Sequence, residues 1–267
     1  MEQTNLLTGN TKTVNRLGYY IAIATAVLCL GTFIIAFLTP PITGPFCIDP
    51  CLEYPYEGIE SRFPRDYLWM YPAMILNVLF IVLMASINQF SMTGKKVFGQ
   101  IGFSFALVSG TLLIVNYFLQ VSVIQPSLLN GETSGIALLT QYNPHGIFIA
   151  LEEIAYLMMS LSFFFMAFVF SNTNPLEKAI RWILIISFAL TIISLLFFSI
   201  VYGVNREYLF EIAIISIDWT VLIVFSILSS IVFRRAMKPI LYERLYRQHP
   251  LLNCTQNILF IDQKTNP

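Results

Sequence analysis

Six long apolar segments constrain the fold of this 267-residue chain more than any other feature. A helix that crosses a bilayer needs roughly 20 mostly apolar residues. Six stretches have this length: residues 17–38, 68–90, 97–124, 144–170, 179–201 and 208–233. Because lipid cannot hydrogen-bond to the backbone, spanning segments of this kind are expected to be helical. The sequence therefore predicts an all-α integral membrane bundle of six transmembrane helices.

The composition agrees with a membrane protein that has no separate soluble domain. Hydrophobic residues make up 57% of the chain and charged residues 11%, whereas charged residues are about a quarter of a typical soluble domain. Fifteen basic and fifteen acidic residues cancel, so the net charge does not indicate nucleic-acid binding. The flanks, residues 1–16 and 234–267, are too short to bury a core. We expect one transmembrane domain, residues 17–233, in contact with lipid and without a cofactor.

The placement of Lys and Arg predicts the orientation. With six spans, twelve of these residues fall on the side of the two termini and three fall on the other side. Cytoplasmic loops carry the excess of positive charge in membrane proteins. Both termini are therefore predicted to be cytoplasmic, in a multi-pass protein of the cell membrane. The stretch 240–252 of the tail is predicted to form a short helix at the inner lipid surface.

The outer connection 39–66 holds five acidic residues, two arginines and a pair of cysteines. Its acidic excess either keeps the loop solvated or forms a vestibule that attracts cations. Cys47 and Cys51 face an oxidising compartment in this topology, so they are disulfide candidates. Two thiols without a nearby histidine make a weak metal site, and we predict no metal centre.

Small residues and a short apolar piece indicate how the helices and loops pack. Gly18, Ala22 and Ala26 recur every four residues in the first span, and Gly102, Ala106 and Gly110 do so in the third. Stripes of this kind let helix backbones approach closely in membranes. In the second outer connection, residues 136–139 are too short to span and are predicted to form a short helix at the outer surface.

The fourth span carries two adjacent carboxylates, Glu152 and Glu153, which are costly in hydrocarbon unless they find a partner, water or a proton. At about 1.5 Å per residue from the outer boundary, Glu152, Asn77 and Asn116 lie about 12 to 13 Å deep and Asp218 about 15 Å deep. These side chains should face the interior of the bundle, because unpaired polar groups are expensive in lipid. The predicted intramembrane polar site consists of Glu152, Glu153, Asp218, Asn116, Gln120, Asn77, His145 and Glu211.

Within this site, the sequence predicts specific roles for the two glutamates. Glu152 is expected to share a helix face with His145, seven residues earlier. Glu153 points about 100° away, so it is expected to bond to a neighbouring helix or to stay neutral. No Lys or Arg lies within a predicted span to neutralise either carboxylate. Trp219 is predicted to be a core residue.

Three classes of function remain open from the sequence. The first is transport or permeation of a small cation or protonatable solute, with Glu152 and Asp218 as the site. The second is a membrane sensor or an assembly subunit, in which the polar layer only organises helix packing. The third is an intramembrane enzyme, and the sequence argues against it, since it has no Gly-x-Ser-x-Gly, His-Glu-x-x-His or phosphate-binding glycine loop.

Overall fold

The computed structural model describes residues 2–39, 41–48, 50–56 and 58–248, with only the backbone described for residues 2–11, 207 and 238–248. All regular elements within these residues are helical. The six long helices are α1 (Glu2–Phe37), α2 (Met70–Phe90), α3 (Lys96–Leu119), α6 (Ile147–Ala167), α7 (Pro175–Tyr202) and α8 (Glu207–Gln248). Six helices in the described part of the chain are long and apolar enough to cross a membrane. The all-α class and the number of membrane-length helices are therefore as predicted.

Short helical pieces fill the connections. They are η1 (Ile59–Arg62), η2 (Arg65–Tyr67), η3 (Thr93–Lys95), the π-helical turn η4 (Gln120–Ile124), α4 (Gln125–Leu129), α5 (Ile136–Leu139) and η5 (Gly203–Asn205). The short apolar piece 136–139 is thus helical, as expected. The π-helical turn η4 carries the third span on into α4, so that helical structure continues to Leu129 rather than ending at residue 124.

Helix ends differ from the predicted boundaries at both chain ends. Helix α1 already begins at Glu2, and α8 continues through the predicted surface helix of the tail as far as Gln248. Residues 249–252 of that predicted helix lie outside the described residues. The physical reason is that Lys, Arg, Glu and Gln are good helix formers, so hydropathy marks the apolar span but not the end of the helix.

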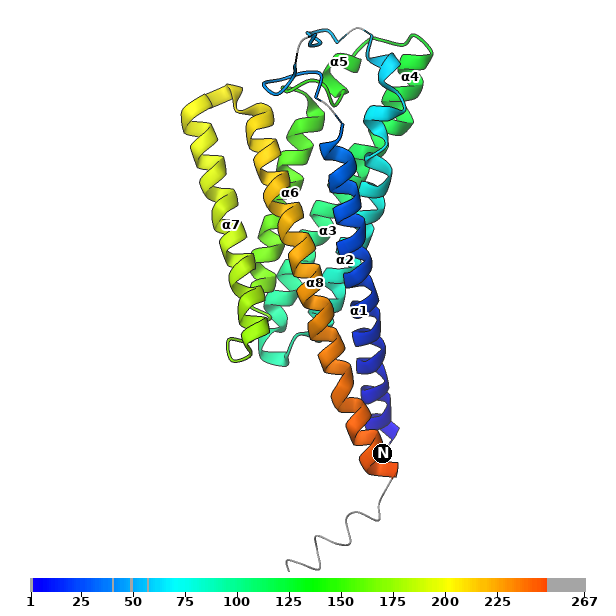
Figure 1. Ribbon diagram of the computed structural model, residues 1–267, viewed down its shortest axis with the longest axis vertical. Coiled ribbons are helices and arrows are strands. Elements are labelled where there is room, and N and C mark those ends of the chain that lie inside the picture. The colour runs from blue at the N-terminus through cyan, green and yellow to red at the C-terminus, as the bar shows by residue number, and fades with distance from the viewer. Residues whose placement is uncertain (1, 40, 49, 57, 249–267) are drawn as a thin grey trace, which may run out of the picture.

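The bundle has two distinct ends (Figure 1). At the loop end lie the long connections that contain α4 and α5, and at the opposite end the N-terminus of α1 lies beside the last turns of α8. Helices α1, α2, α3, α6 and α8 pack side by side as a ring, and α7 packs on the outside against α6 and α8. Much of α7 presents apolar side chains to the surroundings, among them Ile186, Ile193 and Ile200.

Glycines allow the close helix contacts that the small-residue stripes predict. A Cβ atom on Gly18 would come within 2.6 Å of the Phe233 ring of α8, and one on Gly102 within 2.9 Å of Met166 of α6. Real Cβ atoms do not approach other atoms this closely, so larger residues would push these helices apart. Gly18 therefore lies where α1 meets α8, and Gly102 lies where α3 meets α6, whereas Gly110 of the same stripe lies against Ile81 of α2.

Polar groups fix the turn between α6 and α7. Asn174 accepts a hydrogen bond from the N–H of Leu176 at 3.1 Å and so caps α7, whose first residue is Pro175. The Lys95 ammonium group donates to the carbonyls of Val169 and Phe170 at 3.1 and 2.8 Å. These carbonyls follow the end of α6, so the lysine satisfies acceptors that the helix leaves unpaired.

Candidate functional site

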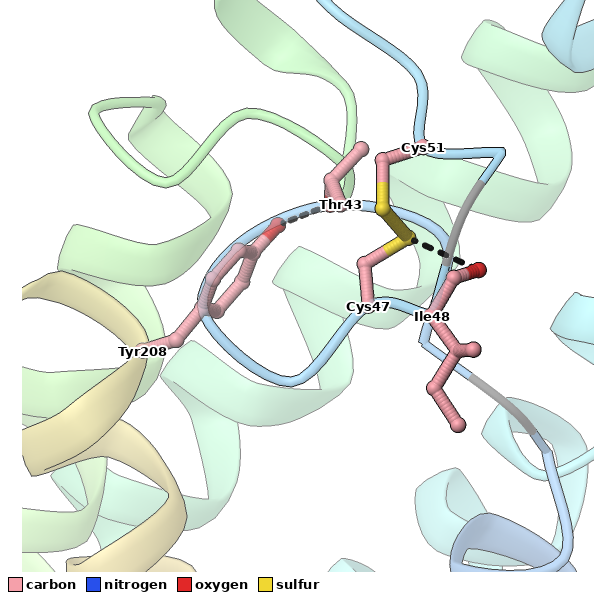
Figure 2. Close-up of a disulfide and its surroundings, with 5 residues drawn as sticks. All are labelled: Thr43, Cys47, Ile48, Cys51 and Tyr208. Carbon is pink, nitrogen blue, oxygen red and sulfur yellow. Dashed lines mark hydrogen bonds between the residues drawn. A yellow bond between two sulfur atoms is a disulfide. The ribbon is translucent and has the colours of Figure 1, made fainter.

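The connection after α1 is folded over the loop end by a disulfide (Figure 2). Cys47 and Cys51 are bonded with an S–S length of 2.06 Å and a Cα–Cα distance of 5.9 Å. This Cα–Cα distance is typical of disulfides. Just after the bridge, the N–H of Leu52 donates to the carbonyl of Ile42 at 2.8 Å. The predicted cysteine pair thus closes a compact turn.

Tyr208 ties this turn to the start of α8 (Figure 2). Its hydroxyl lies 2.9 Å from the Thr43 hydroxyl and donates to the carbonyl of Gln141 at 3.1 Å. The ring lies directly against Gly44, which has φ +74°, and a Cβ at this position would collide with it. Glycine therefore meets two requirements here, a left-handed backbone and space for the ring.

Beneath this turn the bundle encloses a cavity of about 520 Å³. Its walls are the last turns of α1, one face each of α6 and α8, and residues of the connections before α2 and α6. The connection residues are Thr39, Pro41, Ile42, Thr43, Phe46, Asp66, Trp69, Gln141 and Tyr142. Most of the lining is apolar, with aromatic side chains from several elements: Phe33, Phe37, Phe46, Trp69, Phe148 and Trp219. Three carboxyl groups also line it: Glu152 from α6, Glu211 from α8, and Asp66 from the short helix η2 before α2. None of the described residues that line the cavity is Lys, Arg or His.

Glu152 is almost fully buried, with 1% of its surface exposed. It accepts a hydrogen bond of 2.6 Å from the Tyr117 hydroxyl of α3, and its carboxyl group is in hydrogen-bonding contact with that of Glu211. The Tyr117 hydroxyl lies 2.9 Å from the Tyr156 hydroxyl, to which the indole N–H of Trp219 donates at 2.9 Å. Three helices therefore converge on one carboxyl pair.

Glu153, the next residue, has an entirely different environment. The Arg206 guanidinium donates to its carboxylate at 2.7 Å. Arg206 lies in the turn between α7 and α8, outside the predicted spans, and its guanidinium also lies 5.1 Å from the ring centre of Phe210. No Lys or Arg within a predicted span pairs with Glu153, as expected, but an arginine from outside the spans does, and this pair was not predicted from the sequence. The long arginine side chain brings a charge from the turn down to a residue of the span.

Asp218 lies deeper in the bundle and does not line the cavity. Its side chain is fully buried, with Oδ1 accepting from the Ser160 hydroxyl of α6 at 2.7 Å. Ser160 in turn lies 2.9 Å from the Thr191 hydroxyl of α7. Asp218 Oδ2 has no hydrogen-bond partner among the described residues. The structure thus separates Asp218 from the Glu152–Glu211 pair.

The three amides of the predicted site bond to backbone groups and do not line the cavity. Asn77 donates to the carbonyl of Ala73 in its own helix at 2.9 Å, and Asn116 donates to that of Phe148 at 3.0 Å. Gln120 bridges to the outer connection, donating to the carbonyl of Leu139 at 2.7 Å and accepting from the N–H of Gln141 at 3.1 Å. These contacts hold helices and loops together.

His145 does not share a helix face with Glu152, because α6 begins only at Ile147. The histidine lies in the preceding turn, where its side chain is exposed and its N–H donates to Asn143 Oδ1 at 2.9 Å. The turn residues Pro144 and Gly146 shorten the helix that hydropathy extends to residue 144. The predicted pairing of His145 with Glu152 is therefore wrong.

The acidic outer loop does not act as one charged surface. Asp66 lines the cavity, but it is buried and accepts from Arg65 at 2.6 Å and from the Tyr142 hydroxyl at 3.1 Å. Burial raises the pKa of Tyr142, so this residue remains a neutral donor. Glu53 and Glu60 are exposed and do not line the cavity, and Asp49 and Glu57 lie outside the described residues.

Sequence reasoning missed Tyr117 and underestimated Trp219. Tyr117 is fully buried, and the only signal for it was a tyrosine placed well inside an apolar span, next to Asn116. Trp219 is indeed a core residue, in edge-to-face contact with Phe33 at 5.6 Å, but it also forms part of the cavity wall.

Within the described residues, no three or more His, Cys, Asp or Glu side chains are grouped so as to hold a metal ion. Comparisons with protein-family models, with curated proteins and with solved structures found no match for this chain. Six apolar helices are compatible with a multi-pass membrane protein. The cavity and its side chains are therefore the basis for assigning an activity.

Proposed function

We propose that this membrane protein binds a small organic cation in the cavity at the loop end and transports it. One observation carries the proposal. Glu152 and Glu211 form an acidic pair in a cavity of about 520 Å³ whose described lining contains no basic side chain. A cation entering this cavity would supply the positive charge that the pair lacks, and desolvated carboxylates gain most from such a partner.

The cavity walls favour an organic cation over a bare metal ion. The volume lies within the usual range for small-molecule sites, roughly 300 to 1,000 Å³. Aromatic rings attract a cation through their negative faces, the arrangement that recognises quaternary ammonium groups in other sites. Trp69, Phe148 and Trp219 all line the cavity. An ammonium group with an apolar body matches both the walls and the acidic pair.

Transport through this cavity depends on how the protein is oriented in the membrane. The excess of Lys and Arg at the end that holds the termini would place the loop end, and with it the cavity, outside the cytoplasm. A solute would then enter from outside and reach a site within the membrane. Sites of many transporters lie near the bilayer midplane between helices, and this cavity lies between α1, α6 and α8.

Binding is tested with three probes that share a phenylethyl body but differ in charge: trimethyl(2-phenylethyl)ammonium, 2-phenylethanol and 3-phenylpropionate. The readout is tryptophan fluorescence of the purified protein with Trp182→Phe, because Trp69 and Trp219 line the cavity and Trp182 does not. We expect the ammonium probe alone to change the emission in a saturable manner. Glu152→Gln should abolish the change, whereas Glu60→Gln, which removes an exposed charge outside the cavity, should not.

Two outcomes would overturn the proposal. Equal responses to the ammonium probe and the alcohol would show an apolar cavity without charge selectivity, and no response to any probe would argue against this ligand class. If binding is found, uptake of the ammonium probe into proteoliposomes separates transport from binding alone. Uptake equal to that of protein-free liposomes would reject transport.

A second candidate is the assembly or structural subunit. It is favoured by the amide contacts, since Asn116 and Gln120 bond to backbone carbonyls and not to the cavity. Under this reading the acidic pair also serves packing only, and Glu152→Gln would leave the melting temperature unchanged or raised in the absence of any probe response.

A further inference from the structure

The contact between Glu152 and Glu211 requires a proton. A carboxylate has only acceptor atoms, so two carboxyl groups in hydrogen-bonding contact need at least one proton between them. Both side chains are buried, with 1% and 7% of their surfaces exposed. With a single proton, the pair consists of one carboxylic acid that donates to one carboxylate.

The surrounding hydrogen bonds indicate which residue holds that proton. The Trp219 indole can only donate, so its N–H points to the Tyr156 oxygen. The Tyr117 hydroxyl donates to Glu152, so the bond between the two tyrosines is donated by Tyr156. Each hydrogen bond in this series is donated in the direction of Glu152. Hydrogen bonds accepted by a carboxyl group favour its charged form, so this arrangement assigns the charge to Glu152 and the proton to Glu211.

No other described side chain near the pair offers a positive charge. The titratable or charged groups that bond to the pair, act on it or line its cavity are Tyr117 of α3, Glu153 and Tyr156 of α6, Tyr208 of α8, and Asp66 and Tyr142 of the connections. On the remaining packed elements, Cys29 of α1 bonds to the carbonyl of Trp219, and Asp218 of α8 lies deeper in the bundle. Arg206 is bonded to Glu153, and Arg65 to Asp66. The proton on Glu211 is thus the positive charge that neutralises one member of the pair.

From this geometry we propose, building on the proposed function, that an organic cation enters the cavity by replacing the proton of Glu211. The O–H bond of the Glu211 carboxylic acid breaks, the proton leaves to water, and the cation takes its place between two carboxylates. One positive charge enters and one leaves, so the charge of the site is unchanged. Transport by this route is an electroneutral exchange of one cation for one proton.

The test measures binding and proton release separately on the full-length protein. Trimethyl(2-phenylethyl)ammonium has no dissociable proton, so any acidification must come from the protein. It is added to weakly buffered protein with a pH-indicator dye, while tryptophan fluorescence reports occupancy. We expect one proton released for each probe bound, and an affinity that rises about tenfold per pH unit while the free pair is protonated, since each bound cation replaces one proton.

Glu211→Gln supplies the matched variant. The glutamine amide can donate to Glu152 as the acid does, so the variant should still bind the probe through Glu152, with no proton release and no pH dependence. Glu60→Gln should release protons as the unaltered protein does. If Glu211→Gln does not fold, the pH dependence of affinity in the unaltered protein tests the inference alone.

The outcomes distinguish the inference from the function on which it rests. Absence of probe binding would overturn both. Binding without acidification, at an affinity independent of pH, would overturn the exchange and leave the binding site. Undiminished proton release from Glu211→Gln would overturn the assignment of the proton to Glu211.

Discussion

Glu211 of the cavity pair and Asp218 lie on the same helix, α8, yet only Glu211 can be reached from the cavity. Glu211 and Glu152 line a cavity of about 520 Å³, whereas Asp218, seven residues after Glu211 on α8, does not. Seven residues correspond to about 10 Å along a helix. The acidic residues of both regions are buried, so burial does not distinguish them. An acidic residue within a span indicates a ligand site only where a solute can reach it.

Their hydrogen bonds differ in the same way. The cavity pair is approached by tyrosine and tryptophan donors from α3, α6 and α8, while Asp218 has only hydroxyls, Ser160 directly and Thr191 behind it. Both networks join helices, but only the first leaves a face of the acid toward open space. We therefore expect substitutions in the cavity pair to change ligand affinity, and substitutions in the Asp218 cluster to change the stability of the bundle.

The largest expected effect is on affinity. Glu152→Gln should weaken binding of trimethyl(2-phenylethyl)ammonium on the order of 100-fold, about 3 kcal/mol, because it removes a desolvated charge that faces the cation. Asp218→Asn should change the affinity less than about twofold, since Asp218 does not line the cavity. Fluorescence titration of both variants checks the difference. Equal losses would show that the two acidic regions act as one site.

The second prediction concerns stability in the Asp218 cluster. Ser160→Ala should lower the free energy of unfolding by about 2 kcal/mol, because it removes the hydrogen bond to a fully buried carboxyl group. Ser162→Ala is the matched control, since Ser162 is also buried on α6 but its hydroxyl has no partner among the described residues. Thermal unfolding of both variants is compared. A similar cost for both would mean that the Asp218 contact does not stabilise the bundle.

Membrane crossings are predictable from sequence because bilayer thickness sets a minimum apolar length. Helix ends are not, as α1 and α8 show, because polar residues continue a helix beyond the lipid. The acidic residues of the site were also found from sequence, since charge is costly in hydrocarbon. This free-energy cost applies to each acidic residue separately, so such residues can be recognised in a sequence without knowing how the helices pack.

The pairing within the site was not predictable in the same way. Contacts such as Glu152 with Glu211, or Arg206 with Glu153, depend on how each helix is rotated and offset against its neighbours. No single-helix pattern contains that information. Tyr117 was missed for the same reason, because a tyrosine in a span becomes informative only when its hydroxyl is known to meet a carboxylate.

The third prediction concerns the cover of the cavity. Cys47 and Cys51 should resist alkylation by N-ethylmaleimide until the protein is reduced, in a Cys254→Ser background that removes the tail thiol. Replacing both by serine should cost at most about 2 kcal/mol, since the bridge closes a very short loop. The Asp218 cluster lies away from this turn, so the additional cost of Ser160→Ala should be the same with and without the bridge. Labelling before reduction would show that the bond is absent.

The smallest difference between matched variants is expected where the turn over the cavity meets α8. Gly44→Ala places a Cβ into the Tyr208 ring and strains a backbone with φ +74°, whereas Gly58→Ala introduces only the backbone strain, at φ +84° with open space around it. A left-handed backbone costs a non-glycine residue about 1 to 2 kcal/mol, so both variants should be destabilised, Gly44→Ala by about 1 kcal/mol more. Displacing Tyr208 should also loosen the turn over the cavity, so that Gly44→Ala alone speeds dissociation of the ammonium probe in stopped-flow fluorescence. Equal dissociation rates in the two variants would show that this turn does not limit access to the acidic pair, and that the difference between the two regions arises from depth alone.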